Sequence, residues 1–127
     1  AAHAANVTRR LDLERVPVVI DIAIPCGLIL NELVSNALKH GFPDGRDGEI
    51  SVTLGPANHD EILLTVSDNG VGAPDGFDFR CGRTLGLQTI FGVAEHQLQG
   101  TVTFESTPGE GVTCRVRFPR DVYKPRV

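Results

Sequence analysis

The pattern of apolar residues predicts one long amphipathic helix, over residues 28–40, as the central element of the chain. When this segment is drawn as a helix at about 100° per residue, its apolar side chains share one face: Ile29, Leu30, Leu33, Val34, Ala37 and Leu38. Pro25 is typical of a first helical turn, and Gly41 followed by Pro43 is typical of a helix end. One face of the helix is therefore expected in the core, and the other face is polar.

Several other segments show the alternation or the β-branched composition of strands: residues 7–13, 18–22, 50–54, 61–67, 101–106 and 112–118. Apolar residues at helical spacing predict a second helix over residues 86–99, which ends at Gly100. This order predicts an α+β fold, a two-layer sandwich whose mixed, mostly antiparallel sheet is covered on one face by helices. The folded domain is expected over residues 7–118, with flexible ends at residues 1–6 and 119–127.

Composition narrows the possible functions. The 127 residues suffice for one domain with its own core, and the net charge of −4 argues against a general nucleic-acid binder. The 3 cysteines are far apart and fit neither a disulfide framework nor a zinc site. The sequence shows no apolar run of the length that crosses a bilayer and no signal segment. We therefore expect a cytoplasmic domain without direct membrane contact.

The polar face of the first helix is unusual, because asparagine and serine are poor residues in the middle of a helix. Glu32 and Asn36 lie four residues apart and share a face, and Lys39 follows about one turn later. This row suits a metal-bound phosphate: the amide oxygen for Mg²⁺, the carboxylate for a water molecule and the ammonium group for phosphate. The alternative is a polar face that packs on a neighbouring domain.

A glycine-rich turn at residues 68–72 opens a long loop without periodicity. Asp68 is placed to accept a hydrogen bond from an amino group, and Gly70 and Gly72 allow a ligand to approach the backbone closely. The loop leads into the N-terminus of the second helix, where the N–H groups of residues 84–86 and the helix dipole favour phosphate. By itself, the turn also fits an ordinary hairpin end.

Taken together, four segments resemble the histidine-kinase-like ATPases, also called the GHKL superfamily. Residues 31–40 (Asn-Glu-Leu-Val-Ser-Asn-Ala-Leu-Lys-His) resemble its N box, residues 68–72 its G1 box, residues 84–87 its G2 box and residues 109–113 its last glycine box. The segments occur in the family's order, and the resemblance covers about residues 7–118. The first segment is most similar to bacterial sensor histidine kinases of the HisKA_2 and HWE types.

The resemblance implies that three residues of the N box are catalytic, Glu32, Asn36 and Lys39, and that His40 also binds the nucleotide. Asn36 would be the Mg²⁺ ligand, Lys39 would contact phosphate, and the neighbouring His40 would pack near the adenine or the ribose. Glu32 occupies the position where gyrase and mismatch-repair ATPases hold a water-activating carboxylate. This position is often asparagine in other histidine kinases, so a role of Glu32 as a base stays open.

The glycine boxes imply the remaining nucleotide contacts. Asp68 would accept a hydrogen bond from the adenine amino group, with Thr113 near the same ring edge. Backbone close to the nucleotide is expected at Gly70, Gly72 and the residues of the G2 box: Thr84, Leu85, Gly86 and Leu87. The loop over residues 73–85 would be the ATP lid. It is short and lacks a clear F box, although Phe77 and Phe79 are candidate lid anchors.

By resemblance, the chain is the ATP-binding half of a two-component sensor kinase. It would transfer the γ-phosphoryl group to a histidine on a separate dimerisation and phosphoacceptor domain, and a response regulator would act downstream. None of the 4 histidines here lies in a setting that suits a phosphoacceptor. Two alternatives stay open at this point: a protein serine kinase of the anti-sigma-factor type, and a nucleotide-sensing or docking module without transfer activity.

Overall fold

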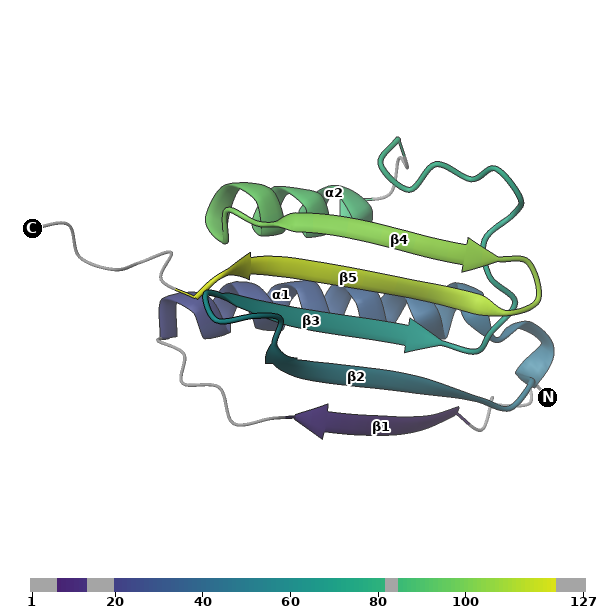
Figure 1. The fold of residues 1–127 in the computed structure, drawn as a ribbon. Coiled ribbons are helices and arrows are strands. Elements are labelled where there is room, and N and C mark those ends of the chain that lie inside the picture. Colours follow the sequence, from purple (N-terminus) through teal and green to yellow (C-terminus); the bar gives the residue numbers. More distant parts are fainter. Residues whose placement is uncertain (1–6, 14–19, 82–84, 121–127) are drawn as a thin grey trace, which may run out of the picture.

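The computed structural model describes residues 7–13, 20–81 and 85–120 (Figure 1). The strands are β1 (Val7–Leu13), β2 (Gly48–Pro56), β3 (Glu61–Asp68), β4 (Thr101–Thr107) and β5 (Gly111–Pro119). The main helices are α1 (Ile20–Asn36) and α2 (Leu85–Gly92). Each main helix continues as a π-helical turn, η1 (Ala37–Gly41) after α1 and η3 (Val93–Gln97) after α2, and a short 3-10 turn, η2 (Pro43–Gly45), precedes β2.

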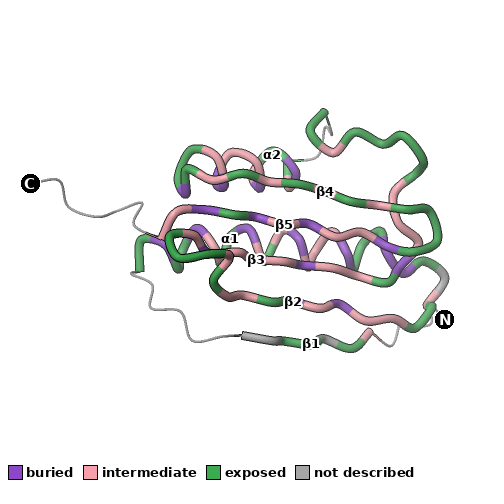
Figure 2. The backbone as a smooth tube through the Cα atoms, viewed as in Figure 1, coloured by how far each residue is buried: buried purple, intermediate pink, exposed green. Residues whose placement is uncertain are grey.

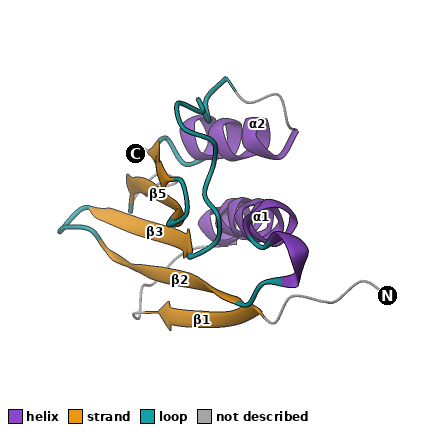
Figure 3. Ribbon diagram, turned by 90° about the vertical axis from the view of Figure 1, so that its right-hand side faces the viewer, coloured by secondary structure: helices purple, strands orange, loops and turns teal. Residues whose placement is uncertain are grey.

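The five strands form one sheet with the order β1-β2-β3-β5-β4. β1 runs parallel to β2, whereas the other neighbouring strands are antiparallel. Both α1 and α2 lie on the same face of this sheet (Figure 3). The predicted α+β sandwich, with a mixed and mostly antiparallel sheet and helices on one face, is therefore confirmed.

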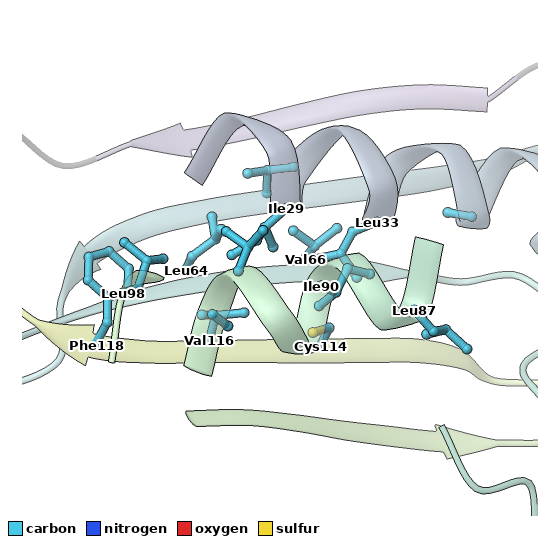
Figure 4. Packing of buried hydrophobic residues seen from close by; sticks show 14 of the residues in the cluster. Ile29, Leu33, Leu64, Val66, Leu87, Ile90, Leu98, Cys114, Val116 and Phe118 are labelled. Carbon is cyan, nitrogen blue, oxygen red and sulfur yellow. The ribbon is translucent and has the colours of Figure 1, made fainter. Parts of the chain in front are cut away.

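The core lies between the helices and the covered face of the sheet (Figure 4). Alternation places every second residue of the central strands in it, and burial along β3 and β5 follows this period (Figure 2). Paired residues of these strands are buried together: Ile62 with Phe118, Leu64 with Val116 and Val66 with Cys114. The helices cover these pairs with buried side chains that include Ile29, Leu33 and Ile90.

The start of α1 corrects the prediction of a strand over residues 18–22. Residues 18 and 19 lie outside the described part of the chain, but Ile20 to Ile22 are helical, and Pro25 lies inside the helix. The buried residues Ile22, Pro25, Ile29 and Leu33 are three or four residues apart, so the apolar stripe extends further toward the N-terminus than expected. A short β-branched run fits a buried helix turn as well as a strand.

The same helix also corrects the prediction that the chain has no apolar segment long enough to cross a bilayer. The segment Ile20–Gly41, 22 residues long, is by length and composition apolar enough to cross a membrane. It is apolar on two sides, because the side chains opposite its buried stripe include the exposed Ile20, Ile24 and Leu28. Its buried stripe belongs to the core of this domain, and a core helix passes the same test of length and composition as a membrane span.

The remaining predicted elements agree with the structure apart from their ends. The second helix ends at Gln97 with its π-helical turn, and Gly100 closes the segment by donating its N–H to the carbonyl of Ala94 (2.8 Å). β5 reaches Pro119, and the N–H of Arg120 donates to the carbonyl of Asp60 (2.9 Å), so the folded part extends slightly past the predicted limit. The predicted flexible segments at residues 1–6 and 121–127 lie outside the described residues.

Candidate functional site

A cavity of about 500 Å³ brings together the end of α1, the glycine-rich turn after β3, the loop that follows it, α2, β4 and β5. Its walls are mostly apolar, with side chains that include Leu33, Val66, Val71, Phe77, Phe79 and Phe104. Five of the predicted site residues also line it: Asn36, His40, Asp68, Gly72 and Leu87. The structure therefore joins three segments that are far apart in the sequence at one cavity of a size that suits a small ligand.

Asp68, the last residue of β3, is the acidic group of this cavity. Its Oδ1 accepts a hydrogen bond from the N–H of Gly70 (2.9 Å), which fixes the carboxylate at the start of the turn. Burial raises the pKa of Asp68, and the backbone N–H groups of Gly70 and Val112 oppose that rise. A carboxylate that is partly withdrawn from water in this way is a strong acceptor for an uncharged N–H donor.

The glycine-rich turn is held against the end of η1 by backbone contacts. The N–H of Val71 donates to the carbonyl of Gly41 (2.8 Å), and a Cβ atom at Gly70 would collide with that same carbonyl. A Cβ at Gly41 would lie 3.4 Å from Oδ1 of Asp68. These contacts place the predicted N box directly against the predicted G1 box.

The structure gives the glycines a further role that the sequence did not indicate. Gly70 was expected to admit a ligand, but it gives room to the chain itself, and among the two turn glycines only Gly72 lines the cavity. Gly72 (φ +74°) would place a Cβ 2.6 Å from the carbonyl of Thr107, and Gly111 (φ +94°) would place one against the carbonyl of Asp68. All three positions need glycine because backbone from another segment lies where a side chain would be.

The polar face of α1 meets the N-terminal end of α2. A Cβ at Gly86 would lie 2.7 Å from Oε2 of Glu32 and 3.6 Å from Oδ1 of Asn36. Asn36 lines the cavity, whereas Glu32 lies beside it. The alternative in which this face packs on a neighbouring domain is thus not needed, because α2 of the same domain lies against it.

The donor chemistry of this corner fits Mg²⁺ held together with a phosphate. Among the residues that the structure describes, there is no group of three His, Cys, Asp or Glu side chains that would hold a metal by itself. Mg²⁺ keeps several waters and is usually bound through one or two protein oxygens plus phosphate oxygens of the substrate. The single amide oxygen of Asn36, with the carboxylate of Glu32 nearby, matches that requirement.

Other predicted residues are not brought to the cavity. Lys39 is exposed on η1 and Leu85 is 78% exposed, so their contacts with phosphate stay predictions. Gly86 does not line the cavity, although it lies against Glu32. Thr84 lies outside the described residues.

Thr113 is a clear departure from expectation. In β5 it pairs with Ser67 and Glu105, and it lies between Val112 and Cys114, which both line the cavity. Because successive side chains of a strand point to opposite faces, Thr113 is on the uncovered face of the sheet. The structure therefore does not bring its hydroxyl group to the predicted adenine edge, since the register of β5 turns that face away.

Several cavity residues carried no motif in the sequence. Phe104 of β4 and Cys114 of β5 line the cavity, and burial raises the pKa of the Cys114 thiol to about 12, so it stays neutral. The sequence held one signal for Cys114: it alternates with Val116 and Phe118 along residues 112–118, and this spacing predicts that all three lie on the buried face of the strand. Phe79 of the lid stacks on Phe104 with ring centroids 4.3 Å apart, and Phe77 contacts Phe79 edge to face at 4.9 Å.

Comparison with known proteins agrees with this geometry. Residues 22–122 match the family model described as histidine kinase-, DNA gyrase B-, and HSP90-like ATPase. The chain is 31% identical over 93 residues to the sensor histidine kinase PdtaS of Mycobacterium tuberculosis. This match covers 72% of the present chain and 18% of PdtaS. It is 30% identical over 87 residues to blue-light-activated histidine kinase 2 of Erythrobacter litoralis. That match covers 68% of the present chain and 25% of the relative.

A solved structure shows the same fold. The blue-light activated histidine kinase EL346 of Erythrobacter litoralis superposes with a TM-score of 0.86 at 22% identity, over 94% of this chain and 37% of that chain. The present chain spans about a fifth to a quarter of the length of the two curated relatives. The likeness thus covers one domain of larger proteins.

Proposed function

Because the chain belongs to the family of histidine kinase-, DNA gyrase B- and HSP90-like ATPases, we propose that it is the ATP-binding catalytic domain of a sensor histidine kinase. The observation that carries the proposal is the cavity itself. Asp68, a half-buried acceptor, and Asn36, an amide oxygen donor, line the same mostly apolar space of about 500 Å³. A purine base with an amino group and a metal-bound phosphate chain need this combination.

In the proposed binding mode, Asp68 accepts a hydrogen bond from the adenine amino group, and the apolar walls pack on the base. His40 lies beside the adenine or the ribose. Asn36 would hold Mg²⁺, which neutralises phosphate charge when bound. The phosphates extend toward the N-terminal end of α2, where backbone N–H groups and the helix dipole stabilise them, and Lys39 contributes its charge from η1.

The proposed reaction is transfer of the γ-phosphoryl group to an imidazole nitrogen of a histidine on the phosphoacceptor domain of the parent protein. The bond between the γ-phosphorus and the bridging oxygen of ADP breaks, and a phosphorus–nitrogen bond forms in line with it. In this proposal, Glu32 orients the imidazole and takes its proton. The domain's main contribution is to position ATP and neutralise charge. The phosphohistidine would then supply a response regulator.

The two curated relatives compared above favour a histidine over a serine as the acceptor, because each is named a histidine kinase and is at least 30% identical to this chain over about 90 residues. We propose a cytoplasmic location within a larger sensor protein, with ATP and the phosphoacceptor domain as direct partners and no role for nucleic acid or lipid.

Titration calorimetry with a non-hydrolysable ATP analogue, with and without Mg²⁺, tests the proposal. Asp68→Asn should weaken binding at least about tenfold, because the amide places a donor where the adenine amino group needs an acceptor. Asp60→Asn, the same chemical change in the exposed loop between β2 and β3, should leave binding unchanged. Absence of binding to the wild type at millimolar analogue, or equal binding by Asp68→Asn, would overturn the proposal.

A further inference from the structure

Residues 77–81 of the lid, here called its return arm, contact α2 and η3 outside the cavity. Nη2 of Arg80 donates to Oε1 of Glu95 (2.9 Å) and lies 2.8 Å from Oε2, so the guanidinium group contacts both carboxylate oxygens. The guanidinium carbon also lies 4.7 Å from the centroid of the Phe91 ring. Arg80 thus makes an ion pair with η3 and a cation–π contact with α2 at the same time.

The neighbouring aromatic side chains point the other way, to the cavity. Phe79 is stacked parallel on Phe104, and Phe104 in turn lies 5.7 Å from Phe91. Phe77, Phe79 and Phe104 line the cavity, whereas Arg80, Phe91 and Glu95 do not. One cluster therefore connects the lid, β4 and α2, with its charged contacts on the outside and its aromatic rings toward the ligand space.

A local turn produces this division of sides. Oδ1 of Asp78 accepts hydrogen bonds from the backbone N–H groups of Arg80 (2.9 Å) and Cys81 (3.4 Å). Such a side-chain to backbone turn fixes the chain direction over these residues, of which Phe79 lines the cavity and Arg80 does not. The other arm of the loop is also tied, because the N–H of Ala73 donates to Oγ of Ser106 (2.8 Å).

We propose that Arg80 is a positioning residue for nucleotide retention. Through Glu95 and Phe91 it holds the return arm of the lid in place, and this keeps Phe77 and Phe79 over the cavity and slows the release of bound ATP. The inference rests on the proposed function. It predicts an effect mainly on the release rate constant, because Arg80 and Glu95 do not line the cavity and act on the ligand only through the lid residues that do.

Stopped-flow displacement of a fluorescent ATP analogue from the full chain measures this rate constant directly. Arg80→Gln removes the charge and should raise the release rate about fivefold, and Glu95→Gln should raise it by a similar factor. The double variant should release no faster than either single variant, because the two substitutions remove one shared interaction. Arg80→Lys, which keeps the ion pair but loses the planar group over Phe91, should fall between wild type and Arg80→Gln.

Arg115→Gln is the matched control, since Arg115 makes an ion pair of 3.0 Å with Glu105 between neighbouring strands, away from the cavity. Its release rate should equal that of the wild type. Added salt should accelerate release from the wild type more than from Arg80→Gln, because only the wild type also loses the ion pair of the lid to screening. Equal release by wild type and Arg80→Gln, or additive effects at positions 80 and 95, would overturn the inference alone. A wild type that binds no analogue would overturn the proposed function as well.

Discussion

At the scale of single residues, Asp68 shows how a binding group is prepared at the expense of the free domain. Burial disfavours its charged form, while hydrogen bonds from the backbone N–H groups of Gly70 and Val112 partly compensate. An N–H donor from a ligand would stabilise the partly buried carboxylate, as in the proposed contact with adenine.

Asp68→Asn should therefore increase the free energy of unfolding of the ligand-free domain at neutral pH. The folded state has the higher pKa, so the wild type carries a penalty above that pKa, and the penalty disappears as the pH falls through it. The gain should stay below about 1 kcal/mol, because the side chain is partly solvated and screened. Urea denaturation at neutral and mildly acidic pH checks this: the two proteins should differ at neutral pH and converge in acid. A variant less stable than wild type at neutral pH would contradict the expectation.

At the scale of elements, the site depends on how closely α2 approaches the polar face of α1. Gly86 lets the first turn of α2 lie against Glu32 and Asn36. This approach explains why glutamate and asparagine occur in the C-terminal half of α1, although helix propensity does not favour asparagine. The two helices share one polar corner, and the motif residues of both belong to it.

Two glycines of α2 give a matched test of this approach. Gly92 has no atom within 4 Å of an added Cβ, so Gly92→Ala should raise the free energy of unfolding by about 1 kcal/mol through helix propensity and leave nucleotide binding unchanged. Gly86→Ala brings the same propensity but places its Cβ against the carboxylate of Glu32. It should weaken Mg²⁺-dependent binding of the ATP analogue about tenfold without unfolding the domain. Thermal melts and calorimetry of both variants measure this, and equal binding by the two would contradict it.

At the scale of the whole molecule, the sheet and the helices hold the cavity, and the proposed reaction takes its histidine from another domain. The described part of the chain contains His40, which lines the cavity, and His59 and His96, which are exposed and do not line it. The chain covers only 18% to 25% of its curated relatives. The proposed reaction is accordingly one between domains.

The chain alone should bind ATP yet turn it over slowly, because in the proposed reaction the nucleophile belongs to the phosphoacceptor domain. Addition of the phosphoacceptor domain of the parent protein should produce phosphoprotein whose label is lost in acid, since phosphohistidine is acid-labile. Glu32→Gln should slow this transfer about tenfold or more if the carboxylate takes the imidazole proton. Acid-stable label would indicate a serine acceptor instead, and rapid hydrolysis by the isolated chain would contradict the assignment as half of a kinase.

Most of the fold was predictable from local sequence patterns. The alternation over residues 50–54, 61–67, 101–106 and 112–118 determined four strands, because side-chain period in a strand is a property of the chain itself. The stripe at helical spacing determined both helices, and the order of the four boxes determined the family. The error at residues 18–22 arose where a short apolar run fits two periods equally well, so the packing of α1 on the sheet decided it.

The sequence by itself therefore determined most of the elements, the fold class and five of the site residues that line the cavity. Tertiary structure alone decided which neighbours those residues have. In β5, Thr113 lies on the face of the sheet away from the cavity. The backbone of Gly41 lies where a side chain at Gly70 would be, and the backbone of Asp68 lies where one at Gly111 would be. In the lid, Arg80 forms an ion pair with Glu95. The physical reason is the same in each case: propensity and periodicity act over a few residues, whereas contacts between distant segments depend on how complete elements pack.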